Sequence, residues 1–133
     1  MGASQRMKGQ RGEREAVSLL RQSLGAAIVE DRDLAQCRDG GGDVRIPAAR
    51  VVVEVKRTQA RAVPTWLAQA HATAAGIGPT WVGAVLWRRN RSPWRAWVAA
   101  PETAIVAGRD GVDLETWLAW VRGRLTMPVE DSK

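Results

Sequence analysis

Apolar residues recur along this chain with two periods, one typical of helices and one typical of strands. Near the N-terminus, Val17, Leu20 and Leu24 have helical spacing and predict a helix over residues 9–24. Counting back four residues from Val17 leads to Glu13. This carboxylate is therefore predicted to lie at the N-terminal end of the apolar stripe and not on the solvated side of the helix.

Simple explanations exist for both ends of this helix. Gly25 is a typical C-terminal stop, and residues 1–8 are polar and are expected to form a loose basic arm. Glu13 would then lie in the first turn, where a carboxylate offsets the helix dipole and contributes about 0.3–1 kcal/mol. Glu15 would serve that role equally well.

The rest of the chain alternates between strand and helix patterns. The valines at 51–53 and 55 are the signature of a buried strand, and Pro47–Ala49 is the turn before it. Strands are predicted over residues 26–30, 43–46, 50–58, 80–87 and 94–100. Helices are predicted over 66–75, with Thr65 as N-cap, and from Asp113 as N-cap to 125. The last helix has an apolar face that packs either within the chain or across a dimer.

The order of these elements predicts the fold class. Strands and helices are interspersed, but the hairpins are too tight for a fully parallel sheet. This favours an α/β sandwich with a central mixed β-sheet flanked by helices. The length of 133 residues is typical of one domain. We expect a single domain over 1–133, with its core at about 8–100 and a C-terminal helical extension at about 101–133.

Composition excludes several classes of protein. No apolar stretch approaches the ~20 residues that a membrane span needs, and the polar N-terminus lacks the apolar core of a signal peptide. Cys37 is the single cysteine, which excludes an internal disulfide and a zinc site built on cysteines. We therefore expect a cytoplasmic protein with no membrane partner.

The charge balance points to a polyanion without identifying it. Lys and Arg number 20 against 14 acidic residues, which gives a net charge of +6. Such a balance is typical of nucleic-acid binding, but a merely soluble basic domain explains it equally well. Seventeen of the cations are Arg, and Lys56 is the one lysine away from the chain ends. Lysine is a compact, titratable point charge, whereas arginine is a planar fork that stays charged.

A candidate site comes from Asp43, Glu54 and Lys56 on the predicted hairpin. Residues two apart in a strand project to the same face, so Glu54 and Lys56 project together and Val55 projects the other way. Charges in a buried strand are unfavourable unless they are paired or bound to a metal. A structural ion pair between Glu54 and Lys56 satisfies that rule as well as a catalytic site does.

Further carboxylates favour the catalytic interpretation. Asp43 opens the preceding strand after a run of three glycines, and the hairpin brings it near Glu54. Two carboxylates and a backbone carbonyl are typical ligands of a hard divalent cation. Glu13, on the apolar stripe of the first helix, can supply another carboxylate to the same place.

These motifs resemble those of the PD-(D/E)xK nuclease superfamily, and within it the archaeal-type Holliday junction resolvases and their phage relatives. Gly9–Glu15 resembles the opening helix of that family, in which the first Glu of an E-R-E string is catalytic; here it is Glu13. Glu54–Thr58 resembles the family's E-V-K-x-T strand.

The likeness covers roughly residues 8–100. Trp66–Gln69 and the strand Trp81–Leu86 resemble the family's later helix and strand, where a Gln, here Gln69, leans towards the site. Gly42 stands where the superfamily name has Pro, and the loop before it is longer than the archaeal one.

The resemblance implies a restriction-endonuclease-like α/β sandwich that hydrolyses DNA phosphodiester bonds with Mg²⁺ or Mn²⁺ and no small-molecule cofactor. Asp43, Glu54 and the Val55 carbonyl would hold the ion. Glu13 would hold a second ion or a metal-bound water, and Lys56 would orient the attacking water or help to deprotonate it.

The substrate implied is branched double-stranded DNA in recombination or repair, in a bacterial or phage-infected cell. Because a four-way junction is two-fold symmetric, a homodimer is the expected cutting form. Two alternatives remain open. One is a repair or restriction-type nuclease of the same superfamily that cuts flaps or duplex, and the other is a non-catalytic basic DNA-binding module.

Ten residues are candidate DNA contacts because they are basic or lie beside the expected site: Arg6, Lys8, Arg11, Arg14, Arg57, Arg61, Gln69, Arg88, Arg89 and Arg91. The basic turn at 88–91 is equally well explained as a solvated hairpin tip.

Overall fold

A mixed β-sheet of six strands forms the centre of the molecule. The computed structural model describes residues 2–31, 42–59, 61–99 and 110–126. The strands lie side by side in chain order: β1 (Glu30–Asp31), β2 (Gly42–Ile46), β3 (Val51–Lys56), β4 (Val82–Trp87), β5 (Arg95–Ala99) and β6 (Val112–Asp113). β3 and β4 are parallel, and the other neighbouring pairs are antiparallel.

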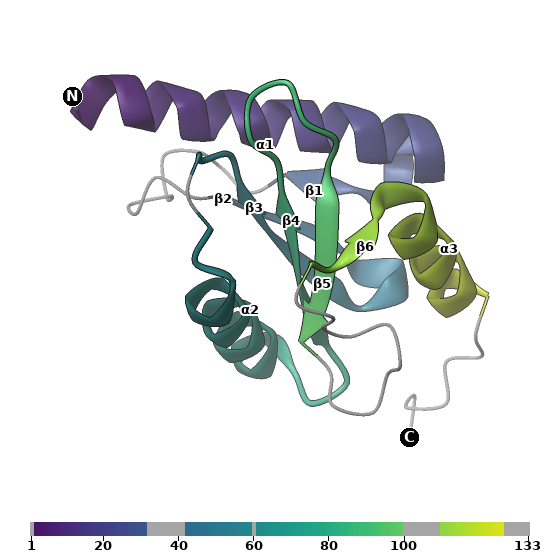
Figure 1. Cartoon of the computed structure of the whole chain (residues 1–133). Helices are drawn as coiled ribbons and strands as arrows, with labels where there is room; N and C mark the ends of the chain where they lie inside the picture. Colours follow the sequence, from purple (N-terminus) through teal and green to yellow (C-terminus); the bar gives the residue numbers. More distant parts are fainter. Residues whose placement is uncertain (1, 32–41, 60, 100–109, 127–133) are drawn as a thin grey trace.

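Helices flank this sheet (Figure 1). Three of them are α-helices, α1 (Gly2–Leu24), α2 (Val63–Ile77) and α3 (Leu114–Leu125), and two short 3₁₀ turns are η1 (Ala26–Ile28) and η3 (Pro47–Ala49). α2 connects β3 to β4, because parallel neighbours need a crossover connection. The chain is thus an α/β structure with a mixed sheet flanked by helices, as the order of the sequence patterns predicts.

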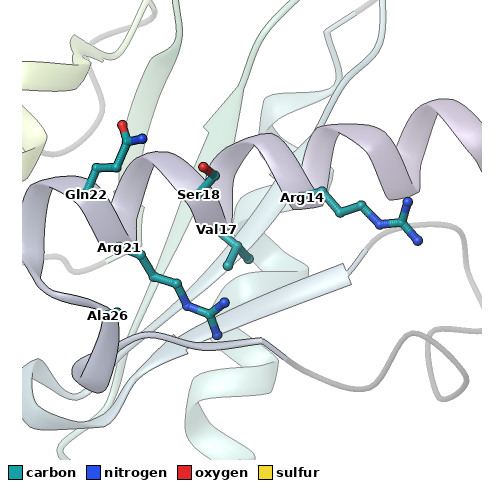
Figure 2. Close-up of a pocket in the computed structure, with 6 residues that line it drawn as sticks. All are labelled: Arg14, Val17, Ser18, Arg21, Gln22 and Ala26. Atoms are coloured by element: carbon teal, nitrogen blue, oxygen red, sulfur yellow. The ribbon is translucent and has the colours of Figure 1, made fainter.

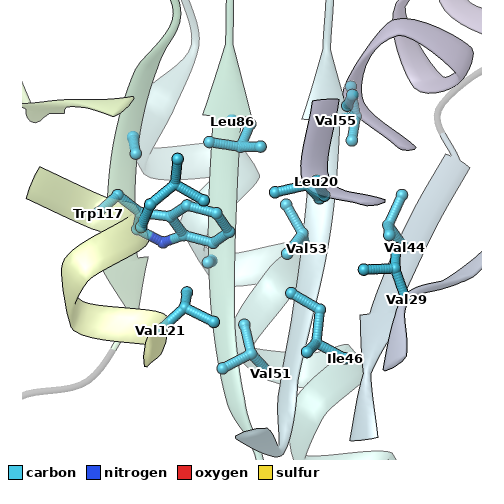
Figure 3. Packing of buried hydrophobic residues seen from close by; sticks show 14 of the residues in the cluster. Leu20, Val29, Val44, Ile46, Val51, Val53, Val55, Leu86, Trp117 and Val121 are labelled. Atoms are coloured by element: carbon cyan, nitrogen blue, oxygen red, sulfur yellow. The ribbon is translucent and has the colours of Figure 1, made fainter. Parts of the chain in front are cut away.

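β3 is buried on both faces. Val51, Val53 and Val55 belong to the larger apolar cluster, which also contains Leu20 of α1 and Trp117 of α3 (Figure 3). On the other face, a smaller cluster joins α2 to β4 and β5 through Trp66, Ala70, Val85, Trp87 and Trp97. The apolar face of the last helix therefore packs within the chain.

The first helix is longer than the sequence pattern predicts. α1 begins at Gly2, so the expectation of a loose arm over residues 1–8 is wrong for residues 2–8. This stretch lacks apolar periodicity but contains good helix formers such as Gln5, Arg6 and Met7, which extend the helix outward. Glu13 consequently lies in the middle of α1, and compensation of the helix dipole in a first turn cannot explain it.

Two other local expectations are wrong. Most of the predicted strand at 26–30 is the 3₁₀ turn η1, and pairing begins only at Glu30. Thr65 is not the N-cap of α2, because that helix already begins at Val63 after Ala62, with Pro64 in its first turn. Proline is favoured there because the first N–H groups of a helix have no partner within the helix.

The predicted hairpin and the last helix are confirmed. β2 and β3 pair antiparallel across η3, with Ile46 opposite Val51. Asp113 caps α3 by accepting a hydrogen bond of 2.8 Å from the backbone N–H of Thr116. Hydrogen bonds from the side chain and backbone of Thr116 hold the pKa of the Asp113 carboxyl below its ordinary value. Within the described ranges, no helix has both the length and the apolarity required to cross a membrane.

The contact between α2 and β4 leaves no room for a side chain at Gly83. A Cβ atom there would meet the backbone oxygen of Ala70 and lie 2.9 Å from its Cβ. We predict that Gly83→Ala lowers the free energy of unfolding by about 1–3 kcal/mol, because α2 must move away from the sheet. Urea unfolding followed by Trp fluorescence measures this change.

Gly76 in the same helix is the matched control, because a Cβ there meets nothing within 4 Å. Gly76→Ala should raise stability by about 0.5–1 kcal/mol, since alanine is the better helix former. Equal stability losses in the two variants would contradict the proposed crowding.

Candidate active site at the end of strand β3

The hairpin register brings the candidate acidic positions together. Asp43 in β2 lies directly opposite Glu54 in β3, and Gly42 lies opposite Val55. Directly opposed residues in an antiparallel pair have Cα atoms about 4.5–5.5 Å apart. The side chain of Asp43 lies outside the described part of the structure, so its placement is that of its backbone.

Glu54 and Lys56 form an ion pair on the α2 face of the sheet. Their parallel neighbours in β4 are Val85 and Trp87, which both belong to the α2 cluster. Lys56 Nζ lies 3.9 Å from Glu54 Oε1, and the side chains are 17% and 14% exposed. The prediction that these two residues project together from β3 is therefore confirmed.

Glu13 is buried, as its place on the apolar stripe predicts. It is 1% exposed, and among the described residues it is the one charged side chain in the buried core. The adjacent Gly12 lies against Arg57, because a Cβ on Gly12 would come within 2.7 Å of the Arg57 Cβ. This places the Glu13 turn at the C-terminal end of β3. α1 covers the face of Val53 and Val55, so Glu13 approaches the strand from the side opposite to Glu54.

The donor set of the candidate site is suited to a hard cation. Carboxylate and carbonyl oxygens are the ligands that Mg²⁺ and Mn²⁺ prefer, and Asp43, Glu54 and Val55 occupy paired positions on adjacent strands. In the described part of the chain, no group of three or more His, Cys, Asp or Glu side chains is placed to hold a metal. The Asp43 carboxylate, which the candidate set requires, is not among the side chains described.

A carboxylate that sequence reasoning assigned no role in the site joins three elements. Glu15 Oε1 accepts from Arg57 Nη1 at 3.0 Å, and Oε2 accepts from Arg88 Nη1 at 3.2 Å. Arg57 Nη2 also donates to Asn90 Oδ1 at 3.1 Å. The one signal in the sequence is the second Glu of the E-R-E string, which falls off the apolar stripe and therefore predicts only a solvated side chain.

Cations gather around Trp87, the β4 neighbour of Lys56. The guanidinium carbons of Arg89 and Arg61 lie 5.0 and 5.7 Å from the centre of its ring, within cation–π range. Trp87 Nε1 donates to the carbonyl and hydroxyl oxygens of Thr58, at 3.1 and 3.2 Å. Arg61 also pairs with Asp110 at 3.3 Å.

The remaining candidate DNA contacts are spread over the surface. Gln69 on α2 and Arg91 in the β4–β5 turn are exposed, and Arg91 has a left-handed φ of 62°. Arg14 is exposed and lines a shallow groove of about 450 Å³ with Ser18 and Arg21 (Figure 2). The side chains of Arg6, Lys8 and Arg11 lie outside the described part of the structure.

Comparisons with known proteins add no relative: no protein-family model, no curated protein and no solved structure matches this chain.

The close approach of α1 to β3 can be tested at Gly12. We predict that Gly12→Ala lowers the free energy of unfolding by about 1–3 kcal/mol, because the new methyl group overlaps the Arg57 side chain and must displace it or α1. Denaturant unfolding measures the change. Gly123→Ala in α3, where a Cβ has no neighbour within 4 Å, is the control and should not destabilise the protein. A Gly12→Ala protein as stable as the control would show that α1 does not depend on this contact.

Proposed function

We propose that this chain is a metal-dependent DNA endonuclease of the PD-(D/E)xK kind that resolves four-way DNA junctions. The observation that carries the proposal is the pair of Glu54 and Lys56 on one face of a buried strand, with Asp43 at the directly opposed position of β2. The order α1, β2–β3 hairpin, α2 and β4 is also the order expected for a restriction-endonuclease-like fold.

Each residue has a distinct task in the proposed reaction. Asp43, Glu54 and the Val55 carbonyl would hold Mg²⁺, with Glu13 adding a carboxylate from α1. When bound, the ion lowers the pKa of water and polarises a phosphoryl oxygen. Lys56 Nζ lies beside Glu54 and donates hydrogen bonds to a water or phosphate oxygen placed next to that carboxylate. A water oxygen then bonds to phosphorus while one ester P–O bond breaks.

Basic residues near the site supply the binding of the DNA backbone. Arg61 and Arg89 lie over Trp87, next to Lys56, and both are exposed at the surface. Guanidinium groups suit phosphate oxygens because they present several donors in one plane. Two paired cuts in a two-fold symmetric junction require two such sites, which a homodimer provides.

The direct test is cleavage of four end-labelled substrates, a four-way junction, a flap, a duplex and a single strand, with and without Mg²⁺. We expect symmetric nicks in the junction alone, and only with the metal. Metal-dependent cleavage of flap or duplex instead would identify a repair or restriction-type enzyme. Absence of cleavage on every substrate would overturn the nuclease proposal.

Lys56→Ala and Asp43→Asn should each keep DNA binding and lose cleavage by at least ~100-fold, because a positioned water and a charged ligand are removed. Binding is measured in Ca²⁺ and cleavage in Mg²⁺. Lys56→Arg is the sharper variant, since it keeps the positive charge and the ion pair but not the compact ammonium. Retained cleavage in both Lys56→Ala and Asp43→Asn would contradict the assignment.

A second candidate is a non-catalytic DNA-binding module, which the 3.9 Å separation of Glu54 and Lys56 favours because an ordinary ion pair explains it. In that case Glu54→Gln leaves a partly buried ammonium without its carboxylate. The free energy of unfolding should then fall by about 1–3 kcal/mol. In a metal-free nuclease site the same change relieves repulsion between carboxylates, and stability should stay the same or rise. Thermal unfolding in EDTA separates the two.

A further inference from the structure

We propose that Glu15 is a positioning residue of the candidate active site. Its carboxylate fixes the turn of α1 that carries Glu13 against the end of the strand that carries Glu54 and Lys56. This inference rests on the proposed nuclease function, which it deepens by naming what holds the acidic positions in place.

The Glu15 carboxylate is shared between two cations from distant parts of the chain. Oε1 accepts from Arg57, just beyond the end of β3, at 3.0 Å. Oε2 accepts from Arg88, at the start of the β4–β5 turn, at 3.2 Å. Both hydrogen bonds are charge-assisted and therefore among the stronger kinds. Figure 1 shows the β4–β5 turn next to α1, in agreement with this bridge.

Other hydrogen bonds keep the two guanidinium groups in place. Arg57 Nη2 donates to Asn90 Oδ1, and the Asn90 N–H donates to Gln59 Oε1 at 3.1 Å. Arg88 Nε donates to the Ser92 carbonyl at 2.9 Å. Because the partners are themselves fixed, the Glu15 carboxylate is held at one position and not by mobile surface side chains.

This network reaches the candidate site through the backbone. Arg57 directly follows Lys56, and the Arg88 N–H donates to the Lys56 carbonyl at 3.1 Å. On the other side, Gly12 packs against the Arg57 side chain. Glu13 and Glu15 are two residues apart in a helix, so they project about 200° apart around its axis. Holding Glu15 therefore sets the rotation of α1 and the direction in which Glu13 projects.

The position of Glu13 matters most for a bound cation. Ligand geometry must be held within about 0.5 Å, and loss of a group that orients a ligand typically weakens metal affinity about 10–100-fold. A residue with only a structural role would lower the melting temperature without changing the metal affinity of the folded protein. Metal affinity is thus the property that distinguishes positioning from general stabilisation.

The test measures binding of Mn²⁺ alone to the full-length, DNA-free protein, by the electron paramagnetic resonance signal of the free ion. Glu15→Ala should raise the Kd for Mn²⁺ about tenfold. Arg88→Ala removes one arm of the network and should raise the Kd less. Glu115→Ala, an exposed glutamate of α3 with the same change in charge, should leave the Kd unchanged. Circular dichroism confirms folding at the assay temperature, and Arg88→Ala carries the test if Glu15→Ala does not fold.

The outcomes separate this proposal from the one on which it rests. A wild-type protein that binds no Mn²⁺ and cleaves no DNA would overturn the nuclease proposal and this one with it. A wild type that binds Mn²⁺, with unchanged Kd in folded Glu15→Ala and Arg88→Ala, would overturn only the role of Glu15. A raised Kd in these variants, an unchanged Kd in Glu115→Ala and unchanged DNA affinity in all of them would support it.

Discussion

The position of β3 between β2 and β4 is the constraint on which the rest of the molecule depends. β3 pairs antiparallel with one neighbour and parallel with the other, so its backbone is bonded on both sides. Its odd-numbered valines fill the cluster under α1 and α3, while its even positions face α2. One strand thereby anchors both apolar clusters and carries Glu54 and Lys56, which allows the charged pair to be held firmly although it is only partly buried.

The sequence predicts those features whose signal is local. The valine run, the turn at Pro47–Ala49 and the cap at Asp113 each depend on neighbours in the chain, and each is confirmed. Burial of Glu13 was predictable because helical periodicity places it in line with Val17 and Leu20. The face and pairing of Glu54 and Lys56 follow in the same way from strand alternation.

The remaining features depend on contacts that periodicity does not encode. Residues 2–8 have no apolar stripe, so nothing in the pattern indicates that the helix propensity of this stretch extends α1. Thr65 matches a cap, but Pro64 stabilises an earlier start. The position of Glu15 between Arg57 and Arg88 depends on sequence separations of 42 and 73 residues. No single-sequence pattern relates charges so far apart, and the same residue in isolation indicates only a solvated face.

The turn between β2 and β3 acts as a reading frame for the chemistry. Arg50 closes it with a left-handed φ of 56° and a hydrogen bond to the Pro47 carbonyl, which fixes Ile46 opposite Val51. A strand has only two faces, so a slip of one residue exchanges everything that it presents. Val53 and Val55 would then face α2, and two charged side chains would enter the apolar cluster beneath α1. An insertion of one residue at this turn, far from Lys56, would therefore be more disruptive than most substitutions next to it.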